Sequence, residues 1–341
     1  MGASEGFHSS LSKGESPLLG IHHITALASD PQRNIDFYVR VLGLRLVKRT
    51  VNFDAPDVYH FYYGDGSGAP GTVLTFFPFT DAGRGRRGFG EAGAISFDMP
   101  HGSRDYWIHR LSRHGITLHG PDRRFGQEVL SFEDPDGLSI DFTFSGHKPA
   151  GQSWTDSPVP AEYRIKGLAG ATLIYRDSGE TATMLRSLLG FHPAGSEGDR
   201  ERYHVGADEN LVTIDLMHTP NSPPARPGAG SIHHIAWRVP GIDDQRAWHA
   251  RIEDSGHSVT GIVDRQYFSS IYFHEPGGVL FEIATDVPGF TVDEPMETLG
   301  TMLKLPPWLE QHRGELERVL PPIDSSPAGQ AQRQATVQHY I

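Results

Sequence analysis

The sequence predicts an α+β protein built from four related βαβββ modules, each with a strand, a helix and three further strands. Two observations carry this prediction. The same order of strand, helix and turn signals recurs four times along the 341 residues. Two of the four segments also open with the same strand-like stretch, Ile-His-His-Ile, at residues 21–24 and 232–235.

The first module, at about residues 19–79, shows the pattern most completely. After the opening strand, Asp30 is a typical helix N-cap, and Pro31 suits the first helical position. Apolar residues then recur at helical spacing, and Gly43 predicts the end of the helix. The later strand patterns lie at 59–63 and 72–77. The third module, at about 165–218, repeats this order.

The second and fourth modules, at about 93–144 and 231–286, resemble each other more closely. Each has a helical stretch that ends in glycine, followed by an Asp-Arg pair. Each then has a Pro/Gly turn before a strand that carries an acid, namely Asp141 and Glu282. The Asp-Arg pair of the fourth module is Asp264-Arg265.

The Pro/Gly/Ser-rich stretches 146–162 and 219–230 predict linkers. We therefore expect modules one and two at 19–145, modules three and four at 163–290, and a C-terminal helical extension at 291–320. Within this extension, residues 296–318 are expected to be helical, with packing residues Trp308, Leu309, Leu316 and Val319. The polar end, from about Asp324, is expected to be disordered.

Composition excludes several kinds of protein. The formal net charge of −12 argues against a general nucleic-acid partner, which needs a basic face. Cysteine is absent, so disulfides, thiolate metal sites and a cysteine nucleophile are excluded. Neither a signal peptide nor a membrane-spanning run is evident, which predicts a cytoplasmic protein without a membrane partner. A homo-oligomer is left open.

One glycine-rich motif matches a nucleotide-binding pattern but lies in a different sequence context. Residues 83–88, Gly-Arg-Gly-Arg-Arg-Gly, match the glycine pattern of dinucleotide-binding loops. A strand-like segment follows instead of a helix, and no acidic ribose partner lies at the right distance. We interpret the stretch as a flexible basic connection.

The two His-His pairs indicate a metal site. Neighbouring side chains on a strand face opposite sides, so one histidine of each pair would face a shared cavity and the other would lie behind it. The corresponding places in the second and third modules, Gly93-Ala94 and Ala169-Gly170, have no histidine. If the pairs served the fold of each module, all four copies would need them.

Glu282 is the candidate third ligand. It lies mid-strand among apolar residues, where a carboxylate is costly unless it is paired or binds a metal. The alternative is a strand residue that faces solvent. Two imidazoles and one carboxylate form the facial triad of non-haem Fe(II) enzymes, and Mn(II) has the same preferences.

The chain resembles the vicinal oxygen chelate superfamily and, within it, the ring-cleaving dioxygenases that act on hydroquinones. The resemblance spans about residues 19–320. It includes both His-His pairs, the Gly-Gly-x-x-x-Glu ending at Glu282, and Leu-Pro-Pro-Trp-Leu-Glu-Gln-His-Arg at 305–313. It implies two open, barrel-like halves, with modules one and four sharing the metal half.

The same resemblance implies site residues and a reaction. The metal, Fe(II) or Mn(II), would be held by His23, His234 and Glu282. The substrates would be a small aromatic diol, of the hydroquinone or catechol type, and O2. Further site residues that the resemblance implies are His22, Thr25, His233, Arg265 and Tyr272.

Roles for these further residues follow from their chemistry. His22 or His233 would handle protons, and Arg265 or Tyr272 would stabilise negative charge on oxygen. The structural alternatives are a surface ion pair for Arg265 and strand packing for Tyr272. Two other functions fit the same scaffold: a glyoxalase-like isomerase or lyase, and a protein that binds a small molecule without turnover.

Overall fold

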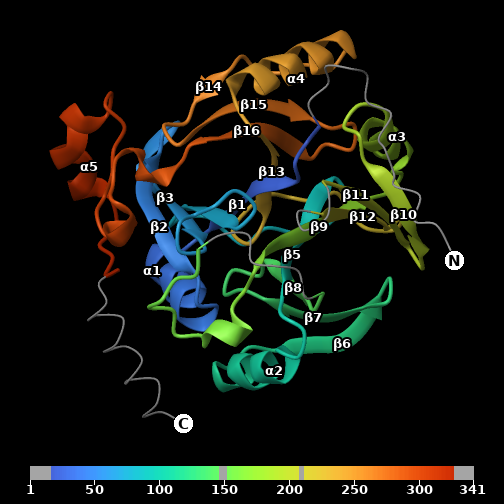
Figure 1. Cartoon of the computed structure of the whole chain (residues 1–341), viewed down its shortest axis with the longest axis horizontal. Coiled ribbons are helices and arrows are strands. Elements are labelled where there is room, and N and C mark those ends of the chain that lie inside the picture. The colour runs from blue at the N-terminus through green and yellow to red at the C-terminus, as the bar shows by residue number, and fades with distance from the viewer. Residues whose placement is uncertain (1–16, 146–151, 207–210, 326–341) are drawn as a thin grey trace, which may run out of the picture.

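The computed structural model describes residues 17–145, 152–206 and 211–325. Within these residues the strands form two eight-stranded sheets (Figure 1). The first sheet contains, in spatial order, β14 (Val263–Asp264), β15 (Phe268–His274), β16 (Leu280–Pro288), β13 (Ile232–Val239), β1 (Ile21–Ala28), β4 (Val73–Pro78), β3 (Ala55–Gly64) and β2 (Arg45–Asn52). The second contains β10 (His192–Glu197), β11 (Arg200–Val205), β12 (Val212–His218), β9 (Gly167–Tyr175), β5 (Glu91–Asp98), β8 (Ser139–Thr143), β7 (Gln127–Glu133) and β6 (Leu118–Arg124).

The first sheet therefore joins strands from the two ends of the described chain, shown in blue and orange in Figure 1. Its central strands, β1 and β13, pair antiparallel, as β5 and β9 do in the second sheet. This architecture confirms the predicted fold class. The division of the chain at 19–145, 163–290 and 291–320 stays a prediction.

Helices cover the outer sides of the sheets. They are α1 (Pro31–Ile35), continued by the π-helical η1 (Asp36–Val41), α2 (Arg104–Arg113), α3 (Gly179–Ser187), α4 (Ile242–Asp254) and α5 (Arg313–Val319). Asp30 caps α1 as predicted, because its Oδ1 accepts a hydrogen bond of 2.8 Å from the Arg33 amide. Gly43, with φ +75°, follows the end of η1. The π-helical turn was not predicted.

The helix expected over 296–318 is wrong in its first part. Only short 3₁₀ turns and α5 occur there, because Pro306 and Pro307 interrupt the segment. Leu316 is buried as expected, whereas Trp308 and Val319 are exposed. The 3₁₀ turns of the described chain are η2 (Ala161–Tyr163), η4 (Phe290–Val292), η5 (Met296–Thr298) and η6 (Glu310–His312). The end expected to be disordered lies, beyond residue 325, outside the described residues.

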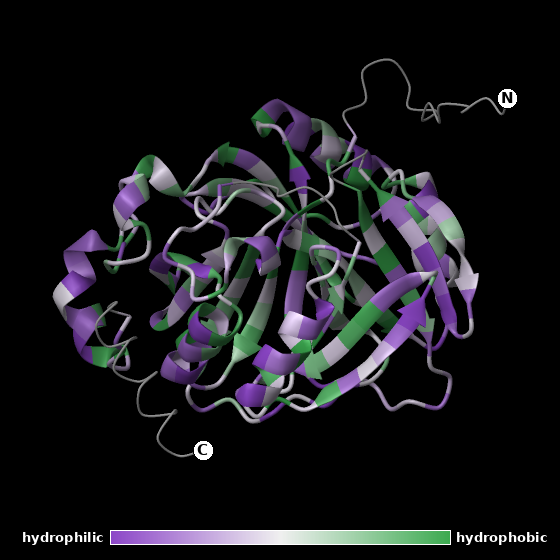
Figure 2. Ribbon diagram, turned by 60° about the horizontal axis from the view of Figure 1, so that its bottom comes forward, coloured by the Kyte–Doolittle hydropathy of each residue, from purple (hydrophilic) through white to green (hydrophobic). Residues whose placement is uncertain are grey.

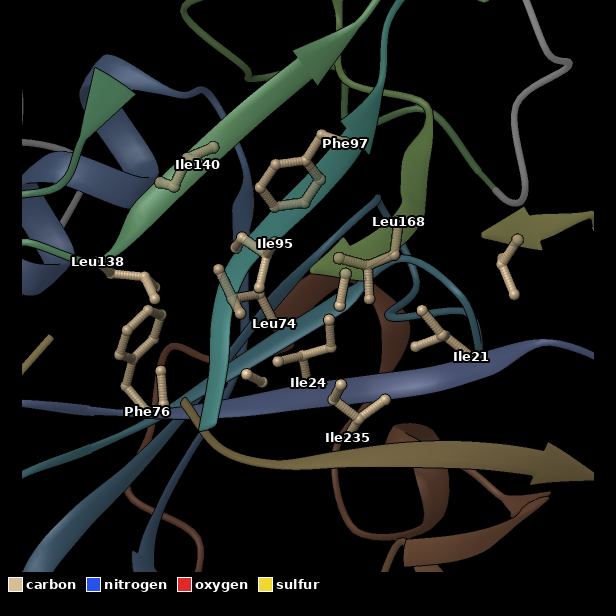
Figure 3. Close-up of a cluster of buried hydrophobic side chains, with 14 of the residues drawn as sticks. Ile21, Ile24, Leu74, Phe76, Ile95, Phe97, Leu138, Ile140, Leu168 and Ile235 are labelled. Carbon is tan, nitrogen blue, oxygen red and sulfur yellow. The ribbon is translucent and has the colours of Figure 1, made fainter. Parts of the chain in front are cut away.

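The main core lies between the two sheets. Figure 3 shows side chains from both sheets meeting there, among them Ile24 of β1, Ile235 of β13 and Ile95 of β5. All three are fully buried. Hydrophobic and hydrophilic residues alternate along many strands (Figure 2). Because Ile24 and Ile235 point into the core, the residues that alternate with them point to the opposite face of the first sheet.

The glycine-rich stretch 83–88 is an ordered part of the fold. It pairs with the second expected linker through bridges from Arg84 to Ala229 and from Arg86 to Arg226. A β-carbon on Gly88 would lie 2.1 Å from the Pro223 carbonyl oxygen. Its glycines therefore permit a close approach of two backbones, and the expected flexibility is wrong. Among the described residues, no helix has both the length and the apolar character needed to cross a bilayer.

Candidate metal centre

The two His-His pairs lie at β-bulges of the β1–β13 pairing. Ile21 pairs with Trp237 and His23 with Ala236, so His22 is an extra residue on β1. In the same way, His233 is an extra residue on β13, between the pairs that His234 and Ile232 make with β1. A bulge interrupts strict alternation and re-aims the side chains beside it. Both His233 and His234 consequently line one cavity, contrary to the expectation of one histidine from each pair.

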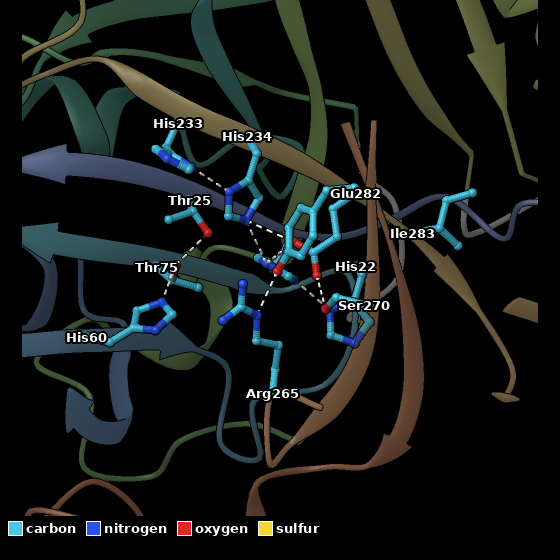
Figure 4. Close-up of polar contacts among 12 residues, drawn as sticks. His22, Thr25, His60, Thr75, His233, His234, Arg265, Ser270, Glu282 and Ile283 are labelled. Atoms are coloured by element: carbon cyan, nitrogen blue, oxygen red, sulfur yellow. Dashed lines mark hydrogen bonds and ion pairs between the residues drawn. The ribbon is translucent and has the colours of Figure 1, made fainter. Parts of the chain in front are cut away.

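The side chains of His23, His234 and Glu282 converge on the face of the first sheet that lines a cavity. Figure 4 shows two of them, His234 and Glu282, close together. The Nε2 atoms of His23 and His234 lie 3.2 Å apart, and Glu282 Oε2 lies 3.4 Å and 2.9 Å from them, respectively. Ligand atoms that lie about 2.1 Å from one ion at right angles are about 3 Å from each other. The three donor atoms therefore have the spacing of one face of an octahedron, and the residues fit a divalent metal ion.

The other ring nitrogens of the two histidines face their sequence neighbours. His23 Nδ1 lies 2.9 Å from His22 Nδ1, and His234 Nδ1 lies 2.8 Å from His233 Nδ1. Burial, with a smaller effect of His234, lowers the pKa of His233 to about 4. Burial likewise lowers the pKa of His22 well below its usual value. Both neighbours are therefore neutral at pH 7 and can accept a hydrogen bond from the Nδ1–H of His23 and His234, which leaves a lone pair on Nε2 of each of these two histidines.

Glu282 is fully buried, and only one of its two carboxylate oxygens accepts a well-formed hydrogen bond. Its Oε1 accepts a hydrogen bond from the Ser270 hydroxyl, whereas Oε2 receives no well-formed hydrogen bond from the described residues. Burial acts to raise the pKa of Glu282, but His23 and His234 outweigh it and hold the pKa well below its usual value. An ionised carboxylate with an unused buried oxygen is the group that a cation would complete.

A cavity of about 270 Å³ adjoins these three side chains. Arg265 and Tyr272 also line it, and Arg265 Nε donates a 3.0 Å hydrogen bond to the Tyr272 hydroxyl. The remaining walls are largely aromatic, formed by Phe53, Tyr62, Phe77, Phe79 and Phe268 together with Leu280. His22 and Thr25 do not line the cavity, although both are buried close to it.

Sequence reasoning missed a hydrogen-bonded chain along one wall of the cavity. His60 Nε2 lies 2.9 Å from Thr75 Oγ1, which lies 2.8 Å from Thr25 Oγ1. On its other side, His60 Nδ1 lies 2.9 Å from the Tyr62 hydroxyl. Burial, with a smaller effect of His23, lowers the pKa of His60 well below its usual value. The only hint in the sequence was a histidine inside an otherwise aromatic strand.

The second sheet has a related arrangement in which an arginine balances the charge of the strand acid, Asp141. Asp141 of β8 pairs with Ser96 of β5, just as Glu282 of β16 pairs with Ala236 of β13. In place of histidines, Asp141 contacts the Arg124 guanidinium at 2.5 Å and accepts a hydrogen bond from the Ser131 hydroxyl. Bulges persist in this sheet at Gly93 and Ala169. The described residues therefore offer a triad in the first sheet only.

Comparison with known proteins identifies relatives along nearly the whole chain. The model of the Glyoxalase/Bleomycin resistance protein/Dioxygenase superfamily matches residues 20–142 and 167–283. MhqO of Bacillus subtilis, which bears the provisional name of a ring-cleaving dioxygenase, is 44% identical over 90% of this chain and 97% of its own length. The chlorohydroquinone/hydroquinone 1,2-dioxygenase of Sphingobium indicum is 36% identical over 88% of this chain and 95% of its own.

Solved structures agree with this relationship. A crystal structure from Bacillus subtilis, provisionally named a dioxygenase, is 43% identical and superimposes with a TM-score of 0.87 over 91% of this chain and 99% of that one. Glyoxalase I from Zea mays has a TM-score of 0.59 at 14% identity, over 78% of this chain and 92% of its own, and shows a common fold alone.

Proposed function

Because the chain belongs to the Glyoxalase/Bleomycin resistance protein/Dioxygenase superfamily, we propose that it cleaves the aromatic ring of a hydroquinone-type diol with O2. The observation that carries this proposal is the convergence of two imidazoles and one carboxylate on a cavity with aromatic walls. The name of the 36% identical relative supports a hydroquinone as the diol, with a catechol as the alternative.

His23, His234 and Glu282 would hold the metal, and Fe(II) is the ion that this donor set favours for oxygen chemistry, with Mn(II) as the substitute. When bound there, the ion would supply Lewis acidity and redox coupling between the diol and O2. The cavity has room for one substituted aromatic ring, and its flat walls of Phe77, Phe268 and other aromatic side chains would hold that ring by stacking.

His22 and His233 would fix the protonation of the two histidine ligands. Each lies within hydrogen-bond distance of a ligand Nδ1 and stays neutral, so each can accept a hydrogen bond from the Nδ1–H and orient the ligand ring. His233 also lines the cavity, where its protonated Nε2 can donate a hydrogen bond to a substrate oxygen. This division differs from the sequence-based expectation that either histidine would handle protons.

Tyr272 and Arg265 would act on negative charge that develops on oxygen. Burial, reinforced by the charge of Glu282, raises the pKa of Tyr272, so its hydroxyl stays protonated. Arg265 donates to that hydroxyl oxygen and thereby makes the Tyr272 proton a stronger donor. Together they present a fixed partial positive charge to the cavity. These donors therefore need not reorient when negative charge develops during the reaction.

The test is oxygen consumption after the purified protein has been loaded anaerobically with Fe(II). We expect hydroquinones to be consumed in equal amounts with O2, with loss of aromatic absorbance, and catechols to react more slowly or not at all. Absence of oxygen uptake with every diol would contradict the dioxygenase. Conversion of a substrate without oxygen uptake would instead support an isomerase or lyase, and binding without conversion would support a binding protein.

A further inference from the structure

Two turns from opposite ends of the chain meet at the exposed side of the cavity. The first turn, residues 53 and 54, joins β2 to β3, and both of its residues line the cavity together with Asn52 at the end of β2. The second turn carries Arg265, just before β15. A single ion pair connects the turns in the described chain: Arg265 Nη1 lies 3.0 Å from Asp54 Oδ2. Asp54 is 75% exposed and Arg265 is 20% exposed, so the carboxylate lies on the solvent side of the guanidinium.

The guanidinium of Arg265 has contacts on two sides. On the cavity side, Nε donates to the Tyr272 hydroxyl at 3.0 Å, and the guanidinium carbon lies 5.3 Å from the centroid of the Tyr272 ring. On the solvent side it has Asp54. Burial acts to lower the pKa of Arg265, but Tyr272 and Asp54 outweigh it and raise the pKa. Without Asp54, the long Arg265 side chain keeps one anchor and gains rotamers that lead toward solvent.

The turn that carries Asp54 is itself braced by the C-terminal segment. The Phe53 ring meets the Trp308 ring edge to face, with centroids 5.6 Å apart. The same segment follows the β2–β3 pair closely, since the Lys304 amide donates to the Arg49 carbonyl at 2.9 Å and the Tyr59 hydroxyl donates to the Pro321 carbonyl at 3.0 Å. The Trp of the Leu-Pro-Pro-Trp stretch therefore lies against the mouth of the cavity rather than in the core.

We propose that Asp54 is a positioning residue, which holds the Arg265 guanidinium at the cavity mouth, and that Trp308 braces the turn that carries Asp54. The C-terminal segment thereby helps to position side chains of the site. The kinetic consequence rests on the proposed function. An enzyme whose Arg265 is in place for only a fraction of the time loses kcat/KM in proportion to that fraction.

The first experiment measures steady-state kinetics of the Fe(II)-loaded Asp54→Asn, Asp54→Glu and Trp308→Ala variants with a hydroquinone. We expect Asp54→Asn and Trp308→Ala to lower kcat/KM about three- to tenfold, the scale of one exposed or partly buried ion pair. Asp54→Glu is expected to restore much of the wild-type kcat/KM. The matched control is Asp243→Asn, which removes an exposed ion pair with Arg246 away from the cavity.

A readout independent of turnover keeps the proposal separate from the proposed function. Crystal structures of the wild type and the Asp54→Asn variant are expected to differ in the Arg265 guanidinium, which leaves the Tyr272 hydroxyl in the variant. Thermal unfolding should coincide in the wild type and the Asp54 variants, because an exposed ion pair adds little stability. An unmoved guanidinium together with a wild-type kcat/KM would overturn the role of Asp54. A lowered kcat/KM in Asp54→Asn but not in Trp308→Ala would overturn the brace alone. If no diol is turned over by the wild type, the proposed function fails, and the position of Arg265 in the variant still decides the positioning role.

Discussion

A β-carbon added to Gly170 would lie 2.1 Å from the carbonyl oxygen of Thr213 on the neighbouring strand β12. Gly170 of β9 occupies the place that His23 has in β1, because each follows the bulge residue of its strand and pairs with the parallel strand of its own module. The second sheet can therefore accept no side chain at this position. The pseudo-symmetric scaffold retains its bulges in both sheets, but at this position only the first sheet carries a side chain that can bind a metal.

Gly170→Ala should therefore destabilise the protein without touching the candidate metal centre. An added methyl group that meets backbone on an adjacent strand forces a shift of that strand, which costs about 1–3 kcal/mol. We expect this loss in the free energy of unfolding, measured by urea titration. Gly261→Ala is the control, because its β-carbon would meet no atom within 4 Å. Equal stability of the two variants would contradict the close packing of β9 against β12.

His234→Ala should remove the metal. One of three converging donors disappears, and Glu282 is left buried beside a single histidine, so metal affinity should fall at least about tenfold. Metal content of the purified protein, measured by elemental analysis, should drop from about one ion per chain to nearly none. His101→Ala, in an exposed turn of the other half, serves as the control. A His234→Ala protein with unchanged metal content would rule out the proposed triad.

The donor set could be predicted from sequence for a specific physical reason. Two repeated His-His pairs and an acid within an apolar strand are visible without knowing any contact, and the asymmetry among modules distinguishes function from packing. The bulges at His22 and His233 could not be predicted, because the register of a strand depends on its partner 211 residues away and not on its own alternation. That is why the sequence placed only one histidine of each pair at the cavity.

Other parts of the site depend on contacts that no local pattern announces. Asp54 lies in an ordinary turn and gains a role only through Arg265, from the other end of the chain. His60 joins the wall because β3 lies beside β4 and places it next to Thr75. In the C-terminal segment the helical periodicity was misleading, since two adjacent prolines outweigh the apolar spacing around them.

Tyr272→Phe should slow turnover while leaving metal content unchanged. The substitution removes one hydroxyl donor and the partner of Arg265 Nε but leaves the three candidate ligands intact. Loss of one positioned donor to developing charge typically costs about a hundredfold in kcat, and we expect at least tenfold here. Adding Phe273→Tyr to the Tyr272→Phe variant should not restore kcat, because Phe273 is buried in the main core on the other side of β15. A Tyr272→Phe enzyme with wild-type kcat would assign Tyr272 to strand packing alone.

His60 should give the metal-free protein a measurable part of its pH dependence of stability. Burial holds the pKa of His60 well below its usual value, whereas the unfolded chain binds this proton at about pH 6.5. Between these two values the unfolded state carries the extra proton, so stability falls as pH falls below about 6.5. One such histidine contributes a slope of up to about 1.4 kcal/mol per pH unit.

His60→Gln removes this titration and keeps a polar side chain that can still contact Thr75 or Tyr62. The free energy of unfolding of the variant, measured in urea at pH 7, 6 and 5 with a chelator present, should therefore fall less steeply with decreasing pH than that of the wild type. The exposed His101→Gln variant should keep the wild-type slope. Identical slopes for His60→Gln and the wild type would mean that His60 takes up its proton in the folded protein, and the chain from Tyr62 to Thr25 would then be charged rather than neutral.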